Sequence, residues 1–462
     1  MTGLPPIVSR GSARRKWVTE EDCADLSDRR CSVGIMFESL FDIDPDASEA
    51  QLRELVERCE ELKSKAAAAQ ARATALWAAR RAAAEAASGI PARRRGKGLA
   101  SEIALARRDA PACGNTHLGM AKALVNEMPC TMAALERGQL SEYRALLIVR
   151  ESACLSIEDR RTLDAELAEE ANGFEGWGNR RVAAEAKRIT ARLDAAAVVE
   201  RNNKAVKDRC VTTRPAPNGM VYLTFLMPLT LGIGMYAALK READICGDGR
   251  SRGQIMTDTA YERVTGRPAA EPVSVSLNLV MADTTLAGDD TEPAWLDGYG
   301  PIPAGFACKL TGDAVTDANA KATLRRLYRH PKSGQLVAME SRSRIFPKGL
   351  ADFIGIRDRT CRTPYCDAPI RHHDHATPDR EGGKTNALNG LGACEACNYA
   401  KEAPGWEVVT SQRDGEHRAE YTTPTGATYR SMAPPLPGIP VRQKISLAEG
   451  RISIDLVTFK AA

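Results

Sequence analysis

Aromatic residues and histidine are scarce in this chain of 462 residues: aromatic side chains make up 5% of it, and there are six histidines. No stretch interleaves aromatic with basic side chains as RNA-binding surfaces do, so duplex DNA is the default nucleic-acid partner. The charge also lacks a strong sign, because 64 basic residues face 60 acidic ones and leave a net charge of +4. This balance neither requires nor excludes a polyanionic partner.

The sequence also lacks the pattern of a secretory signal, since the first 30 residues contain no apolar run behind their basic residues. We therefore expect a cytoplasmic protein whose thirteen cysteines are reduced. Its 43% of hydrophobic and 27% of charged residues exclude a chain that is disordered throughout. The length predicts two to four domains.

Long apolar runs are absent with one exception, the 21 uncharged residues Gly219–Leu239, which are long enough to cross a bilayer. However, Pro228 and two glycines interrupt the run, and no aromatic or positively charged flanks support insertion. The β-rich segment Met220–Met227 ends at the proline. We therefore predict a buried strand followed by a helix over residues 229–244, and no membrane partner, with a membrane span as the alternative.

A long helix is predicted from Ser48, the expected N-cap, to residue 87. Apolar residues first recur at helical spacing, and then 14 of the 22 residues in 66–87 are alanine, until Gly89 and Pro91 end the pattern. The helix over 48–87 is a candidate surface for a homo-oligomer or another partner. Packing within its own domain is the alternative.

Amphipathic segments follow at short intervals and predict a mostly helical region over 46–265. They cover residues 99–108, 117–128, 131–137, 141–153, 156–171 and 179–193. A hairpin-like insert is expected around 210–213 and 220–227. Further along, Val273–Val280 alternates apolar with polar residues and predicts a strand.

Charge is polarised between residues 281 and 350. Residues 281–300 contain five acidic residues and no basic one, whereas Lys321–Leu350 contains eight basic residues and a single glutamate. The basic stretch, like the shorter run Arg93–Lys97, either follows a nucleic-acid backbone or forms an ordinary solvated surface.

Four of the cysteines form two close pairs, while the other nine are scattered. Cys361 and Cys366 are five positions apart, Cys394 and Cys397 are three apart, and all four fall within 37 residues. Two such pairs supply the four thiolates that a tetrahedral zinc ion requires. The sequence therefore predicts a structural zinc site, with four reduced buried cysteines as the alternative.

Polar residues of a second kind lie between the cysteine pairs. Asp374 and His375 are adjacent, so in a strand their side chains point to opposite faces, and one can bind a metal while the other addresses a different partner. Asn389 follows a Gly-Gly pair, and the helix expected from Cys394 onward carries Asn398.

The spacing C-x4-C, D-H-x-x-P with a following G-G, an asparagine fourteen residues beyond the histidine, and C-x-x-C-N-x-x-K resembles the ββα-metal HNH nuclease motif. Together with Arg357–Arg362, Cys397–Trp406 and Arg214–Pro217, it resembles the actinobacterial 13E12-type repeat family over about residues 35–406. Members of that family join a helical domain of unknown function to a C-terminal HNH module.

The resemblance implies a role for each matching residue. His375 would be the general base, Asp374 and Asn398 would hold Mg²⁺ or Mn²⁺, and Asn389 would orient the loop that carries the histidine. Many family members have histidine where this chain has Asn398. Strand alternation leaves open whether His373 rather than Asp374 faces the cation.

Contact with DNA would depend on the placement of charges, because residues 355–406 contain seven basic and seven acidic residues. The candidate DNA-binding residues are Arg357, Arg359, Arg362, Lys384 and Lys401.

The sequence therefore predicts a mainly α N-terminal domain with a small β-containing insert and linker, followed by a ββα-metal (HNH, His-Me finger) module with a structural zinc. The expected function is metal-dependent hydrolysis of DNA. The alternative is an inactive, zinc-stabilised protein that binds DNA or accompanies a mobile element. The expected divisions are a poorly structured lead 1–45, a helical domain 46–265, a β-containing connection 266–350, an HNH module 351–406 and a C-terminal extension 407–462.

Overall fold

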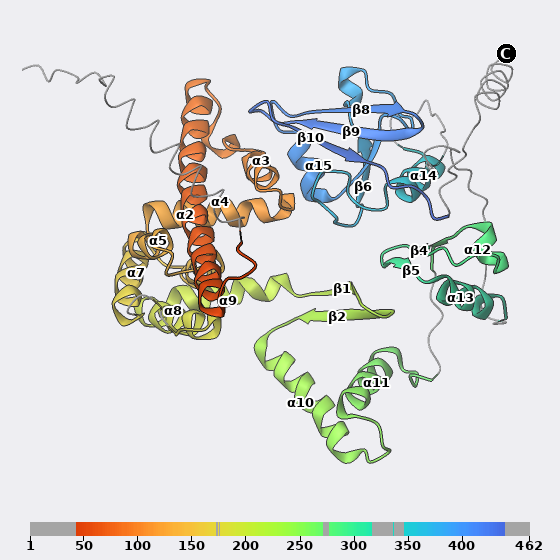
Figure 1. Ribbon diagram of the computed structural model, residues 1–462, viewed down its shortest axis with the longest axis horizontal. Helices are drawn as coiled ribbons and strands as arrows, with labels where there is room; N and C mark the ends of the chain where they lie inside the picture. Colours follow the sequence, from red (N-terminus) through yellow and green to blue (C-terminus); the bar gives the residue numbers. More distant parts are fainter. Residues whose placement is uncertain are drawn as a thin grey trace, which may run out of the picture.

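The computed structural model describes residues 43–171, 174, 176–270, 277–316, 336 and 346–438. Within these residues the protein is mainly helical, with four small sheets (Figure 1). Most of the predicted lead 1–45, part of the predicted strand Val273–Val280 and most of the basic stretch Lys321–Leu350 lie outside the described residues. So does the end of the chain after residue 438.

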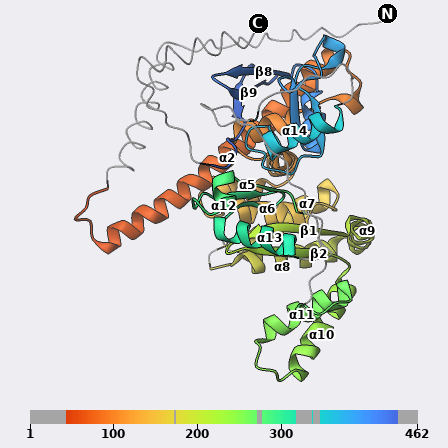
Figure 2. The same ribbon diagram turned by 90° about the vertical axis from the view of Figure 1, so that its right-hand side faces the viewer.

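The long helix is confirmed as α2, Glu49–Ala87. Ser48 caps it: its hydroxyl accepts a hydrogen bond from the Gln51 backbone N–H, and the Gln51 side chain accepts one from the Ser48 N–H. The alanine-rich half of α2 packs on the neighbouring helices through small buried residues such as Ala67, Ala68 and Ala71. Figure 2 shows α2 extending well beyond the rest of the bundle.

All six helices predicted between residues 99 and 193 are present, and a seventh follows them. Their bounds are α3 Leu99–Ala106, α4 Gly114–Asn126, α5 Pro129–Glu136, α6 Glu142–Glu151, α7 Ile157–Ala171, α8 Asn179–Leu193 and α9 Ala195–Ala205. Short 3₁₀ turns connect some of them, at η1 Ala92–Arg94, η2 Pro111–Cys113 and η4 Val206–Asp208. Fully buried side chains, among them Leu124, Leu135 and Ile148, form one core between these helices.

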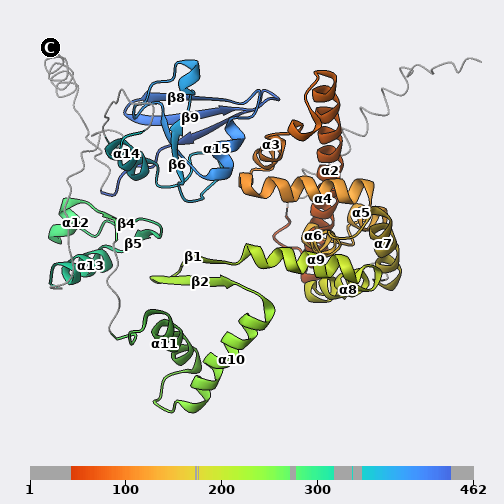
Figure 3. The ribbon, with the colours of Figure 1, turned by 180° about the vertical axis from the view of Figure 1, so that it is seen from behind.

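An arm then leaves the bundle (Figure 3). It consists of the antiparallel strands β1 Cys210–Ala216 and β2 Met220–Leu226, followed by α10 Leu229–Ile245 and α11 Arg252–Thr265. A strand and then a helix on either side of Pro228 were predicted and are confirmed. The strand was expected to be buried, which is wrong: every residue of β2 is exposed. Among the described helices, none is both long and apolar enough to span a membrane.

A small unit of three antiparallel strands follows, in the order β3 Leu279–Val280, β4 Ala294–Leu296 and β5 Gly300–Ile302. The helices α12 Asp283–Ala287 and α13 Ala304–Thr316 belong to the same unit. The Tyr299 hydroxyl donates a hydrogen bond to the Ala216 carbonyl, 2.8 Å away, so this unit contacts the end of β1.

The C-terminal module begins with α14, Lys348–Asp358. The hairpin of β6 His372–His375 and β7 Gly390–Ala393, with the 3₁₀ turn η5 Asp379–Glu381 in its connection, leads directly into α15, Glu395–Lys401. A three-stranded sheet follows, with β8 Glu407–Arg413, β9 Glu416–Thr422 and β10 Thr428–Met432 in the order β10-β9-β8.

This last sheet lies beyond residue 406, where the sequence placed the start of an extension. Its side chains Val408, Ala419 and Tyr421 share one buried cluster with Ala376 and Leu391, which belong to the β6–β7 region. The strands after residue 406 therefore pack as part of the same core as the cysteine segment.

Candidate metal centre and neighbouring polar site

The two cysteine pairs come together in space. The Sγ atoms of Cys361, Cys366, Cys394 and Cys397 all lie within 4.8 Å of one another, and all four residues are buried. The Cys366 and Cys394 sulfurs are 3.8 Å apart. A tetrahedron of sulfurs about 2.3 Å from a zinc ion has edges of about 3.8 Å, so the cluster fits zinc.

Local structure brings the sulfurs to this point. Tyr365 adopts a positive φ of 62°, which turns the chain back between the first two cysteines. Cys394 is the N-cap of α15, and its sulfur accepts a hydrogen bond from the Cys397 backbone N–H. The second pair is therefore set by the first turn of a helix.

The charge of the cluster also favours a cation. Hydrogen bonds from the Cys366 and Cys397 thiols hold the pKa of Cys361 far below its usual range. The same bond from Cys366 to Cys361 raises the pKa of Cys366 to about 12. One thiol can thus ionise while its neighbours stay protonated. Four thiolates at this separation repel one another and require a bound cation to offset that repulsion.

The side chains of β6 alternate between two neighbouring helices. On one face, the Asp374 carboxylate contacts Lys401 of α15, and the His372 ring lies 6.4 Å from the Tyr399 ring. On the other face, His373 lies against α14, where a Cβ on Gly355 would be 3.6 Å from its Nε2. The structure therefore places Asp374, rather than His373, on the side of the helix that carries Asn398.

Asp374 is held by Lys401. The Lys401 ammonium lies 2.9 Å from Asp374 Oδ2 and also donates to the His375 carbonyl at 3.1 Å. Burial acts to raise the pKa of Asp374, but the hydrogen bond and charge of Lys401 outweigh it and keep that pKa below its ordinary value. The carboxylate is ionised and available as an oxygen ligand, with an ammonium at one of its oxygens.

His375 lies on the face of β6 opposite Asp374. Its side chain is 8% exposed, its ring centroid is 4.7 Å from that of Phe346, and its Nε2 lies 2.8 Å from the Thr385 hydroxyl. Its Nδ1 is 3.7 Å from Asp374 Oδ1, a separation too long for a hydrogen bond. The ring is therefore held by an aromatic contact and one hydroxyl.

Asn389 fixes the loop between β6 and β7. Its Oδ1 accepts from the Thr377 N–H at 2.9 Å, and its Nδ2 donates to the carbonyls of Thr377 and Lys384, both at 3.0 Å. The Asn389 carbonyl also accepts from the Ala376 N–H at 2.7 Å. The buried amide thus ties the segment directly after His375 to the far side of the loop.

Asn398 presents an acceptor that lacks a partner. Its Oδ1 is buried and makes no hydrogen bond within the described structure. Leaving such an atom unpaired costs about 1–3 kcal/mol. An amide oxygen on α15 and the carboxylate of Asp374, which contacts the same helix, are the oxygen donors that Mg²⁺ or Mn²⁺ prefers. These donors are of the chemical type that suits Mg²⁺ or Mn²⁺, and Lys401 occupies one oxygen of the carboxylate.

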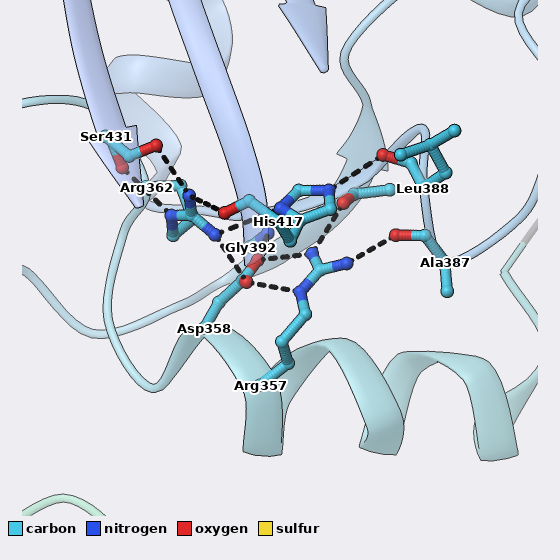
Figure 4. Close-up of polar contacts among 9 residues, drawn as sticks. Arg357, Asp358, Arg362, Ala387, Leu388, Gly392, His417 and Ser431 are labelled. Atoms are coloured by element: carbon cyan, nitrogen blue, oxygen red, sulfur yellow. Dashed lines mark hydrogen bonds and ion pairs between the residues drawn. The ribbon is translucent and has the colours of Figure 1, made fainter. Parts of the chain in front are cut away.

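Two of the five arginines and lysines predicted to contact DNA lie inside the protein. Arg357 and Arg362 are each 3% exposed, and both bind the fully buried carboxylate of Asp358 (Figure 4). Arg357 also donates to the carbonyls of Ala387 and Gly390. Each guanidinium offsets a buried charge and satisfies backbone carbonyls, so neither is exposed for the contact with DNA for which it was a candidate.

The other three predicted DNA contacts differ in exposure. The Lys401 side chain is only 6% exposed and is bound to Asp374, so its ammonium is already paired inside the module. Arg359 is half-buried, with its guanidinium 4.4 Å from the Trp295 ring centroid. Lys384 is exposed, on the loop between β6 and β7.

Two residues of this region were not found from the sequence, His417 and Thr385. The His417 ring lies beside Arg362, and its Nε2 donates to the Leu388 carbonyl at 2.8 Å, which leaves Nδ1 as an acceptor 3.3 Å from Arg362 (Figure 4). Burial, followed by the charge of Arg357, lowers the pKa of His417 to about 4. A single histidine in an alternating strand gives no sign of such a contact.

Comparisons with known proteins match residues 53–358 to the family described as a domain of unknown function, DUF222. No curated protein and no solved structure matches the chain. The match covers the bundle, the arm, the three-stranded unit and α14, and it ends before the first cysteine of the metal cluster. Because it spans about two thirds of the sequence, the chain belongs to the DUF222 family.

Proposed function

We propose that the protein is a metal-dependent HNH endonuclease that hydrolyses phosphodiester bonds in duplex DNA. The observation that carries the proposal is the order of elements in one short unit. The first strand of the hairpin, β6, ends in Asp374-His375, and the second strand, β7, is followed at once by α15. A hairpin followed at once by a helix supports the ββα arrangement that the resemblance to HNH nucleases implies. The hydrogen bonds of Asn389 across the connecting loop support the orienting role that the resemblance gives to this residue.

In this proposal His375 is the general base. A neutral imidazole accepts a proton from the water that attacks phosphorus, and histidine is suited to this near pH 7. The contacts with Phe346 and Thr385 orient the ring. Asp374 and Asn398 would hold Mg²⁺ or Mn²⁺, and such a cation supplies positive charge against the negative charge that develops on the phosphate and the leaving group.

The four cysteines have a structural role in the same proposal. They join the loop 361–366 to the first turn of α15, so a zinc ion there would fix the helix that presents Asn398 and Lys401. Zinc at this site and the cation at Asp374 differ in ligand chemistry. Sulfur donors select zinc, whereas the oxygen donors select harder ions.

The experiment is nicking of supercoiled plasmid by the zinc-loaded protein with Mg²⁺, Mn²⁺, Ca²⁺ or no added cation. We expect nicking with Mg²⁺ or Mn²⁺, and loss of it in His375→Ala with unchanged zinc content. His372→Ala is the matched control, since it alters a histidine of the same strand on the opposite face. Metal-dependent nicking that survives in His375→Ala would contradict the mechanism.

A second candidate is a non-enzymatic, zinc-stabilised protein that binds DNA or accompanies a mobile element. It is favoured by the Lys401 ammonium on Asp374 Oδ2 and by the low exposure of the His375 side chain. This candidate predicts retention of DNA with no cleavage at any Mg²⁺ or Mn²⁺ concentration. The same plasmid experiment therefore separates the two functions.

A further inference from the structure

The arm, residues 210–265, has almost no core of its own. Only Ala243 of α10 and Ile255 of α11 are buried, and no residue of β1 or β2 is. Thirteen large apolar side chains of the arm are each more than a third exposed. They are Val211, Met220, Val221, Tyr222, Leu223, Phe225, Leu226, Leu229, Leu231, Ile233, Tyr236, Ile245 and Val264.

The exposed apolar side chains of the arm are concentrated rather than scattered. Consecutive exposed residues of β2 point to both faces of the hairpin, and α10 adds Leu229, Leu231, Ile233, Tyr236 and Ile245. Single exposed apolar side chains are normal on a monomer, whereas a large apolar patch marks an interaction site. The arm therefore has the character of an interaction surface.

The charge of the arm limits the kind of partner. Arg214 is the one charged residue in 210–239, and residues 240–264 carry five basic and five acidic residues, so the arm has a net charge of only +1. Several of these charges are already paired within the arm, as Arg263 with Glu242 and Arg252 with Asp244. A nearly neutral surface has little net attraction for nucleic acid or anionic lipid. The partner that fits is itself apolar and nearly neutral.

The edges of the hairpin indicate how that partner is held. β1 and β2 form a two-stranded sheet, so within the described residues each strand has one edge without a neighbour. Pro215 interrupts the hydrogen-bond donors of β1, whereas β2 contains no proline. An antiparallel strand is complementary to its own copy related by a two-fold axis. The available edge is thus one that a second copy of β2 matches.

We propose that the arm is a homodimerisation surface, in which the β2 strands of two copies pair antiparallel into a four-stranded sheet. The apolar side chains of α10 then cover one another across the two-fold axis. An isolated two-stranded hairpin is at best marginally stable in water, and the second copy supplies the strands and apolar cover that it lacks. The proposal is independent of the nuclease function, because no residue of the candidate site belongs to the arm.

The mass of the full-length, zinc-loaded protein in solution tests the proposal, by light scattering after size-exclusion chromatography and by sedimentation equilibrium. We expect a dimer at micromolar concentration. The substitutions Val221→Glu and Leu223→Glu, made together in β2, should raise the dissociation constant at least 100-fold. A wild-type protein that is monomeric at 50 μM would overturn the proposal. The arm would then be covered by another protein or by another part of this chain.

Two control variants separate the arm from other apolar surfaces. Val409→Glu in β8 and Leu76→Glu in α2 alter side chains about as exposed as those of β2, 51% and 54%. Both should leave the dimer intact. A dimer that dissociates with Leu76→Glu but persists with the β2 substitutions would assign the interface to α2 and overturn the proposal.

Hydrogen exchange of the unmodified protein keeps the proposal testable if the β2 variant does not fold. Amides of residues 220–226 should exchange slowly at concentrations where the protein is dimeric and faster at concentrations where it is monomeric. Exchange over β2 that does not change between monomer and dimer would show that the interface lies elsewhere.

Discussion

Lys401 and Asp374 form an ion pair between α15 and β6, with 2.9 Å between Nζ and Oδ2. The same ammonium contacts Glu402, whose other partner is Arg380 at 2.8 Å. The pair positions α15 against the strand and at the same time places a positive charge where the proposed function requires a divalent cation. A divalent cation bound at Asp374, as the proposed function requires, would therefore compete with Lys401 for one carboxylate oxygen.

Replacing Lys401 with Met should strengthen binding of Mn²⁺. Methionine keeps most of the apolar length of the side chain but removes the charge, and Glu402 retains Arg380. Two unit charges about 4 Å apart repel by about 1 kcal/mol in water and by about 4 kcal/mol at an effective dielectric constant of about 20. We therefore expect an effect of at least about 1.4 kcal/mol, or tenfold in affinity. Paramagnetic resonance of free Mn²⁺ during a titration measures the affinity.

The control for this titration is Lys384→Met, which removes an exposed lysine of the neighbouring loop and should leave the Mn²⁺ affinity unchanged. If Lys401→Met instead weakens Mn²⁺ binding, the lysine orients Asp374 for the cation rather than competing with it.

Replacing Cys394 with Ser should remove the structural metal. The purified protein is expected to contain about one zinc per chain, and the variant much less, because serine is a poor zinc ligand in a sulfur site. Zinc binding contributes directly to the free energy of folding of small metal-stabilised units, so the melting temperature should fall as well. Elemental analysis and thermal unfolding measure both effects.

The matched control for Cys394→Ser is Cys59→Ser, a half-buried cysteine of α2 outside the cluster. Its zinc content should equal that of the wild type. A Cys394→Ser protein with full zinc content would show that the metal, if any, is held elsewhere.

The buried histidine His417 should make the protein less stable as the pH falls from about 6.5 to about 4. Its pKa is about 4 in the folded protein and about 6.5 when unfolded, so in this range the unfolded chain binds the additional proton. The difference, at 1.36 kcal/mol per pH unit, corresponds to about 3 kcal/mol, present in full above pH 6.5. Urea unfolding at several pH values measures it.

His417→Gln is the variant that isolates this effect. Glutamine can still donate to the Leu388 carbonyl but does not titrate, so the free energy of unfolding should depend less on pH by about 3 kcal/mol over the same range. Asp358 lies nearby but does not titrate in this range. Arg357 and Arg362 keep its pKa low against the effect of burial, so its contribution to the free energy of unfolding is lost only below about pH 4. An unchanged pH dependence in the variant would contradict the assignment.

The comparison of sequence with structure separates local from distant information. Short-range patterns gave correct predictions. The Ser48 cap and the helical spacing of apolar residues predicted α2, and the two close cysteine pairs predicted the four-cysteine cluster. The burial of Arg362 depends on Ser431 and His417, 69 and 55 positions away. No pattern around Arg362 indicates those partners, so the sequence offered Arg362 as a candidate for contact with DNA and gave no sign of its burial.

The apolar strand Met220–Leu226 shows a different limit. Its composition predicted a strand, and because apolar strands are usually buried, it was expected inside the domain. The composition of the strand indicates that its side chains are to be covered, but it does not indicate which part of this chain or which partner covers them. In this structure the bundle does not cover them, and their exposure is the observation behind the proposed homodimer.

Glu102 of α3 takes part in the contact between the bundle and the C-terminal module. Its side chain is 2% exposed and accepts from Arg81 at 2.8 Å and from the Thr425 N–H at 3.0 Å, on the turn between β9 and β10. Glu102→Ala leaves Arg81 and Thr425 without this partner, so we expect a loss of about 3 kcal/mol in the free energy of unfolding.

The control is Glu136→Ala, which removes the exposed pair with Arg72 and should lower the free energy of unfolding by less than about 1 kcal/mol. Urea unfolding of both variants measures the difference, and limited proteolysis should cut between the two parts faster in Glu102→Ala alone. Equal losses in the two variants would show that Glu102 does not join the bundle to the module.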